Sequence, residues 1–225
     1  MIVEFAVFIG FMIPVYFIYT KYSKNKEICD YFPIFIQEVY NNTSTGMSLV
    51  DAVKKSKNIN YGCLTPMIKN MCLQIEWGVP FNHAIKHFGK KVNNSFIDRM
   101  VILMDKVSQF SQDIGKNMGE IYDYIALTKR LERERKTELF PQLISLYFVF
   151  FVFLGIILII FNFFIPYFDI VEVIQYKEVF IHLVFIESIF LGLTLGKMIE
   201  DSFVAGLKHM TILYTITFIF VMFLF

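Results

Sequence analysis

Residues 142–165 form an unbroken apolar run, QLISLYFVFFVFLGIILIIFNFFI, that contains no Asp, Glu, Lys or Arg. About 20 apolar residues in an α-helix are enough to cross the hydrocarbon core of a bilayer. A backbone in that core must satisfy its hydrogen bonds internally, and a helix does so. The run therefore predicts a membrane-spanning helix in an integral membrane protein.

Three further segments predict spans, which gives four transmembrane helices in an all-α protein. Apolar residues make up 56% of the chain and charged residues 18%, below the roughly 25% typical of soluble domains. The predicted divisions are transmembrane helices at 1–20, 140–166, 179–199 and 210–225, a polar segment at 21–139, an outer loop at 167–178 and a cytoplasmic turn at 200–209.

The basic residues predict the orientation of these spans. Eighteen of the 21 Lys and Arg residues fall between Lys21 and Lys136, whereas the 167–178 loop holds three acids and one lysine. By the positive-inside rule the polar segment is cytoplasmic and both termini lie outside. The same rule explains the basic surplus through membrane lipid, so nucleic acid is not expected as a partner.

The polar segment shows helical spacing and an internal repeat. Between Asn94 and Phe110 one apolar stripe runs through Phe96, Ile97, Met100, Val101, Leu103, Met104, Val107 and Phe110. GMSLVDAVKK, starting at Gly46, matches GVPFNHAIKH, starting at Gly78, 32 residues later. A weaker copy, SQDIGKNM, starts at Ser111 and lacks the glycine.

Each copy predicts a junction at which one helix ends and the next begins. Gly46 and Gly78 can take the left-handed conformation that ends a helix. The next helix then starts at Ser48, at Pro80 or at Asp113. These junctions predict three helical hairpins in a six-helix bundle; a tetratricopeptide or ankyrin solenoid is the alternative, but its dense signature positions and capping repeats are missing.

The junction pattern resembles the F domain shared by type II secretion and type IV pilus platform proteins. DYFPIFIQEVYNNTSTGMSL, from Asp30 to Leu49, is similar to the way archaeal members begin that domain. GLKHM at Gly206, after the FLGLTLGKMIEDSF run, is similar to the closing hairpin of archaellum and pilus versions. The resemblance covers nearly the whole chain.

This resemblance implies a membrane platform that couples a hexameric secretion ATPase to the assembly of pilin-like subunits, in a pilus, an archaellum or a type II-like secretion system. The candidate ATPase contacts are Glu76, Lys129, Arg130 and Arg133. Many family members carry two F domains and this chain shows one, so a second F-domain chain or a homodimer is expected. The alternative is a small transporter or channel subunit, suggested by four spans and the intramembrane Glu187.

No residues predict catalysis, a cofactor or a metal. His83 and His87 stand four apart, as in zinc proteases, but Ala84 occupies the place of the required Glu. No GxxxxGK[ST] phosphate loop is present either. We therefore expect a protein that is not an enzyme and draws its energy from a partner.

Two features of the third span predict helix association. Glu187 lies near its middle, where charge is costly, and favours a packing or subunit contact over a proton path. Gly192 and Gly196 provide a small-xxx-small step that permits close helix approach, within the chain or across a dimer. The charged helix end at 129–138 is interpreted as a solvated helix near anionic headgroups, compatible with a rigid lever that leads into the second span.

Overall fold

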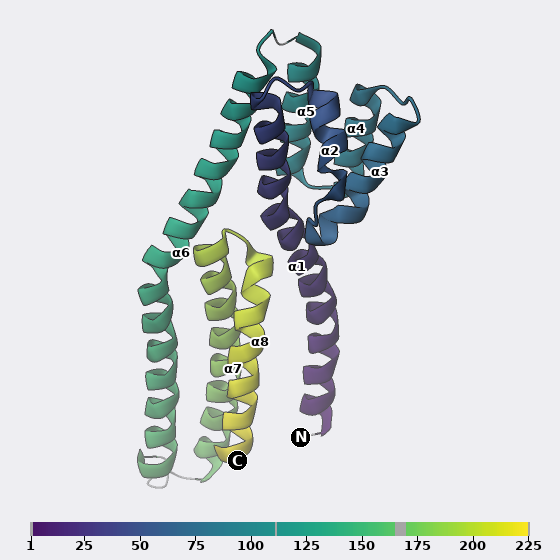
Figure 1. Cartoon of the computed structure of the whole chain (residues 1–225). Coiled ribbons are helices and arrows are strands. Elements are labelled where there is room, and N and C mark those ends of the chain that lie inside the picture. Colours follow the sequence, from purple (N-terminus) through teal and green to yellow (C-terminus); the bar gives the residue numbers. More distant parts are fainter. Residues whose placement is uncertain (1, 111, 165–169, 225) are drawn as a thin grey trace. The chain divides into compact units, whose positions relative to one another are not determined.

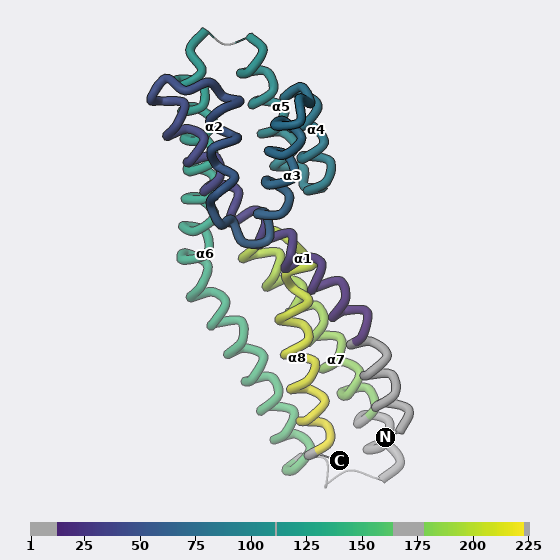
Figure 2. Tube along the Cα trace, turned by 45° about the vertical axis from the view of Figure 1, so that its right-hand side comes forward, coloured from purple at the N-terminus to yellow at the C-terminus, as the bar shows by residue number. Residues whose placement is uncertain are grey.

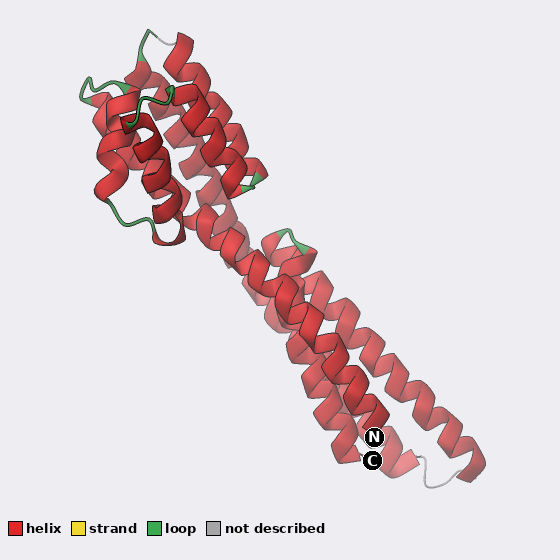
Figure 3. Ribbon diagram, turned by 90° about the vertical axis from the view of Figure 1, so that its right-hand side faces the viewer, coloured by secondary structure: helices red, strands yellow, loops and turns green. Residues whose placement is uncertain are grey.

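The computed structural model describes residues 2–110, 112–164 and 170–224; side chains 1–12, 164–177 and 223–225 lie outside its description. All regular elements of the described residues are helical, as predicted (Figure 3). They are α1 (Ile2–Ser44), α2 (Leu49–Lys55), η1 (Ser56–Asn58), η2 (Gly62–Leu64), α3 (Thr65–Glu76), α4 (Phe81–Val92), α5 (Ser95–Phe110), α6 (Ile114–Ile159), η3 (Ile160–Phe164), α7 (Ile170–Glu200) and α8 (Phe203–Leu224) (Figure 1).

The chain divides into two compact units. Ser23–Leu131 form the first, called the lobe here, and Met1–Tyr22 with Glu132–Phe225 form the second, called the membrane module. The division falls inside α1 and α6, whereas the sequence predicted boundaries after residues 20 and 139. Residues 132–139 belong with the membrane module because Arg135 and Lys136 contact the end of α7.

Six helical pieces make up the lobe: the second half of α1, then α2, α3, α4, α5 and the first part of α6. They run alternately up and down, so the connections after α1, α3 and α5 share one end (Figures 1 and 2). Phe35 sits in their core at 1% exposure, and its ring centroid lies 5.8 Å from that of Tyr61 and 6.2 Å from that of Phe88. This aromatic cluster joins α1, the α2–α3 connection and α4.

One ion pair fastens α4 to α5 inside the lobe. The Asp105 carboxylate is buried and lies 2.8 Å from Lys86 Nζ, and it also accepts a hydrogen bond from Gln109. A buried carboxylate is costly unless it is paired. The lysine of the second repeat copy thus neutralises the buried acid of the next helix.

In the membrane module, α7 and α8 form a tight antiparallel hairpin (Figures 1 and 2). A Cβ on Gly192 would meet the backbone of Met210, and one on Gly196 would meet the backbone of Gly206. Ser188, one turn before Gly192, is fully buried. Small residues at four-residue spacing thus let the two backbones touch.

Among the residues that the structure describes, three helical segments are long and apolar enough to cross a membrane: Ile114–Phe163, Glu178–Glu200 and Phe203–Met222. The last begins seven residues earlier than predicted, because the turn is Asp201–Ser202 and not 200–209. The predicted outer loop is helical from Ile170 onward, since 170–178 contain no Gly or Pro to stop a helix. The predicted first span, 1–20, falls mostly on side chains outside the description and stays a prediction.

Candidate functional site

The first repeat junction is a glycine turn between α1 and α2. Gly46 has φ +89°, and its N–H donates to Thr43 O at 3.0 Å. The next N–H, of Met47, donates to Asn42 O at 3.3 Å. These two bonds satisfy carbonyls that the end of α1 would otherwise leave unpaired.

The second junction, between α3 and α4, repeats the same geometry. Gly78 also has φ +89°, its N–H donates to Ile75 O at 3.1 Å, and Val79 N–H donates to Gln74 O at 3.0 Å. Donors and acceptors match the first junction position by position, 32 residues later. The sequence repeat is therefore a repeat of backbone structure.

The helices that follow begin on three different caps. Ser48 Oγ accepts the N–H of Asp51 at 3.2 Å, and Pro80 precedes the first turn of α4. Asp113 Oδ1 accepts the N–H of Lys116 at 2.9 Å at the start of α6. All three junctions lie at the same end of the lobe, called the junction end below (Figure 1).

Alanine at either junction glycine should lower stability. An L-residue at positive φ costs about 1–2 kcal/mol, and neither glycine has an atom within 4 Å of an added Cβ, so the penalty is backbone strain alone. We expect Gly46→Ala and Gly78→Ala each to lower the thermal midpoint of the detergent-purified protein. Gly155→Ala, in helical α6 and equally open, is the control; a midpoint for the junction variants that equals the control would contradict this account.

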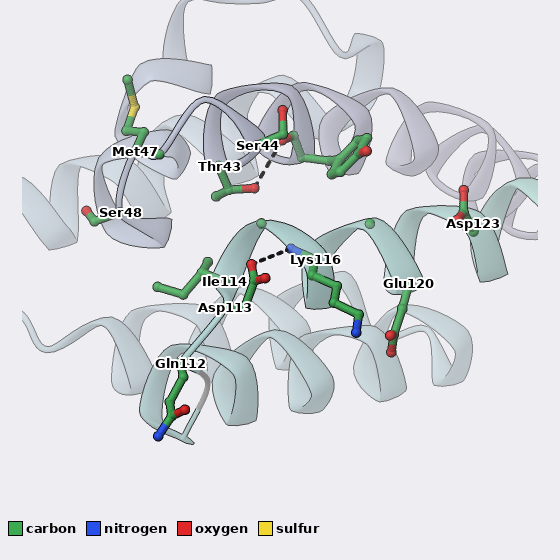
Figure 4. A pocket seen from close by; sticks show the side chains of 14 residues that line it. Thr43, Ser44, Met47, Ser48, Gln112, Asp113, Ile114, Lys116, Glu120 and Asp123 are labelled. Carbon is green, nitrogen blue, oxygen red and sulfur yellow. Dashed lines mark hydrogen bonds between the residues drawn. The ribbon is translucent and has the colours of Figure 1, made fainter.

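A cleft of about 920 Å³ opens between the first and third junctions (Figure 4). It is lined by Tyr40, Thr43, Ser44, Gly46, Met47, Ser48, Gln112, Asp113, Ile114, Gly115, Lys116, Gly119, Glu120 and Asp123. Three of these residues, Asp113, Glu120 and Asp123, are acidic and one, Lys116, is basic. The cleft is therefore negative overall.

The wall of the cleft is built by close contact between α1 and α6. A Cβ on Gly115 would lie 3.1 Å from Thr43 O, and one on Gly119 would lie 3.1 Å from the Tyr40 ring. The Tyr40 ring also stacks on Tyr122 at 5.5 Å. These small residues bring the end of α1 onto the start of α6.

Two large aromatic side chains at the junction end are exposed to solvent. Trp77, the single tryptophan, and Phe110 are each 80% exposed. Phe110 belongs to the apolar stripe noted in the sequence, and it is exposed because it is the last residue of α5 and extends past the core. Leu103, in the same predicted stripe, is also exposed. Exposed aromatic side chains are typical of protein-binding surfaces.

The four candidate ATPase contacts come from different parts of the chain and stay a prediction. Glu76 binds Lys57 at 2.9 Å at the end of α3, whereas Lys129 binds Asp30 of α1 at 3.0 Å. Arg130 is exposed in the lobe, and the exposed Arg133 belongs to the membrane module. The junction-end aromatic residues were missed because exposure depends on neighbours that a sequence pattern does not show.

Within the membrane module, α6 is bonded to the turn between α7 and α8. Arg135 donates from Nε to Met198 O and from Nη2 to Lys197 O, both at 3.2 Å. Both acceptors belong to the last turn of α7, whose carbonyls lack helical partners and carry negative partial charge. A cation there satisfies and stabilises that helix end.

Further polar contacts surround this arginine. Lys136 lies 3.8 Å from Glu200, which also accepts a hydrogen bond from Tyr22 of α1 at 3.2 Å. Lys197 lies 2.6 Å from Asp201, and this hydrogen bond holds the Asp201 pKa below its ordinary value. The predicted lever segment thus has specific partners at the end of α7 and in the turn after it. The group formed by Arg135, Lys136, Lys197, Met198, Glu200, Asp201 and Tyr22 is called the clasp below.

The buried thiol of Cys72 should make the stability of the lobe decrease at alkaline pH. Burial, with a smaller contribution from Glu76, raises the pKa of Cys72 from 9.0 to about 11. The unfolded chain loses this proton near pH 9, so the stabilisation is complete below pH 9 and is lost as the pH rises toward 11. Thermal midpoints measured across this range should fall less steeply for Cys72→Ala than for the wild type; equal slopes would contradict the assignment.

These observations define a class of protein. Its described residues form helices, three of them potential membrane spans, and a lobe of repeated helix junctions. The family model for type II secretion system (T2SS), protein F matches residues 35–161, more than half of the chain. The chain therefore belongs to this family, and the resemblance predicted from the sequence is confirmed.

One relative extends the comparison. The chain is 24% identical over 189 residues to an uncharacterized protein of Methanocaldococcus jannaschii. The match covers 81% of this chain but 31% of the relative, so the chain spans about a third of that protein's length. No solved structure matches the chain.

Proposed function

We propose that this chain is a membrane platform protein that couples a secretion ATPase to assembly of a type IV pilus-like filament or to type II-like secretion. The family match across residues 35–161 carries this proposal, because it includes most of the lobe and the apolar part of α6. Proteins of this family work with secretion ATPases and pilin-like subunits in general. The chain itself acts as a scaffold and not as an enzyme.

The charge distribution supports a cytoplasmic lobe and outer termini. The lobe and the clasp hold most of the Lys and Arg residues, and such residues favour the cytoplasmic side of spans. An ATPase that uses cytoplasmic nucleotide then meets the lobe on its own side of the membrane. Membrane lipid surrounds the apolar helices, and a second F-domain chain or a second copy completes the platform.

The junction end is the surface we assign to the ATPase. Trp77 and Phe110 supply apolar area, and the neighbouring cleft supplies negative charge. Aromatic anchors beside complementary charge are common in binding hot spots. The partner surface should therefore be apolar with basic residues around it.

Site-specific photocrosslinking in native membranes tests this function. A photoreactive residue at Trp77, Phe110, Glu76 or Arg133 is activated in cells that make the ATPase, and adducts are identified by mass spectrometry. We expect crosslinks to the ATPase from Trp77 and Phe110, and none from Asn93, an exposed residue at the connection between α4 and α5. An absence of ATPase adducts at all four positions would contradict the proposal.

A further inference from the structure

Glu187 carries a carboxyl group in a part of the membrane module that has few polar side chains. Between Val179 and Gly196 it is the only Asp, Glu, Lys or Arg of the sequence. Its Oε2 atom is buried and has no hydrogen-bond partner among the residues that the structure describes. Neither the lobe nor the clasp explains this residue.

The helix face that carries Glu187 is packed with apolar side chains. Val184 lies three residues before it and Leu191 four residues after it, which places all three on one face of α7. Val184 and Leu191 belong to the cluster formed with the α6 residues Phe150, Leu154 and Ile157. The half-buried Glu187 side chain therefore has apolar neighbours on its own helix face, and some of these neighbours pack against α6.

Among the side chains that the structure describes, the titratable groups on the neighbouring elements offer no counter-charge to Glu187. From residue 148 to 163, α6 and the following η3 carry no titratable side chain. On α8 the group at this level is Tyr214, whose ring lies 4.9 Å from that of Phe185. On α7 itself, His182 is exposed and Lys197 pairs with Asp201. The α1 acid, Glu4, lies outside the described side chains.

An ionised carboxylate only accepts hydrogen bonds, and it needs donors or a cation when it leaves water. A protonated carboxyl group is neutral and tolerates such a place. We propose that Glu187 is a proton-binding site of the membrane module and holds its proton at neutral pH. This inference is independent of the proposed function.

Infrared difference spectroscopy of the full-length chain in lipid nanodiscs tests the proposal. The wild-type spectrum minus that of Glu187→Gln, at neutral pH, should contain the C=O band of a protonated carboxylic acid. Glu178→Gln is the matched control, because Glu178 is an exposed acid at the start of the same span. Carboxylate bands in the Glu187 difference spectrum would overturn the proposal.

Thermal unfolding of the same samples gives a second readout. Glutamine has nearly the shape of a protonated glutamic acid, so Glu187→Gln should keep the wild-type midpoint. A midpoint well below that of Glu178→Gln would show that the negative charge of Glu187 holds a donor or cation, and it would also overturn the proposal.

Discussion

Leucine in place of Gly196 is expected to prevent the α7–α8 hairpin from closing. A Cβ alone at this position would overlap the backbone of Gly206, and backbone atoms cannot move aside as a flexible side chain can. Overpacking of a well-packed core costs about 1–3 kcal/mol even when side chains can shift, so the effect here should exceed that range. The detergent-purified variant should aggregate or elute heterogeneously in size-exclusion chromatography.

Gly155→Leu is the control for this experiment. Gly155 lies in the apolar half of α6, is exposed, and has no atom within 4 Å of an added Cβ. That variant should elute as the wild type does. A sharp wild-type elution peak for Gly196→Leu would show that the hairpin does not need this close approach.

Truncation of Phe35 to alanine should be the most damaging single change in the lobe. Its ring is fully buried between Tyr61 and Phe88, and Phe→Ala in a core costs about 3–5 kcal/mol. We expect limited proteolysis of the native, membrane-embedded protein to cleave the lobe much faster, because more of the population is unfolded.

The neighbouring residue provides the control. Ile34 is 45% exposed, so Ile34→Ala removes apolar atoms without opening the core. Its proteolysis rate should stay close to that of the wild type. Equal rates for Phe35→Ala and Ile34→Ala would show that the aromatic cluster is not the core of the lobe.

Local features of the fold could be read from the sequence. A glycine followed by a helix-starting residue determines backbone geometry by itself, and Gly46 and Gly78 both adopt positive φ with identical bonding. The uncharged run at 142–165 likewise predicted a helix. The structure places residues 142–159 in α6 and residues 160–164 in η3.

Features that depend on distant partners could not be predicted. From the sequence, Arg135 is one of several charges on a solvated helix. In the structure it donates to the carbonyl oxygens of Lys197 and Met198, which lie 62 and 63 residues away. The early start of α8 depends on the contact of Gly206 with Gly192, Leu193 and Gly196. Trp77 and Phe110 are exposed because no described side chains cover them at the junction end. Each outcome is decided by tertiary packing and not by local pattern.

The clasp contains a contact through which a movement of α6 could be transmitted to α7. The α6 helix begins at the junction end and carries Arg135, which bonds the end of α7. Under the proposed function, a stroke of the ATPase on the lobe would be passed along α6 to Arg135 and from there to the end of α7. Arg135→Lys keeps the charge but loses the two-nitrogen geometry, so it should impair assembly more than Arg99→Lys, which changes an exposed arginine of α5.

The amount of filament or secreted pilin-like protein outside cells that lack this chain tests the platform claim most directly. We expect the extracellular product to disappear in the deletion strain while intracellular pilin and ATPase levels stay unchanged, and to return when the wild-type chain is restored. Undiminished product in the deletion strain would contradict the account.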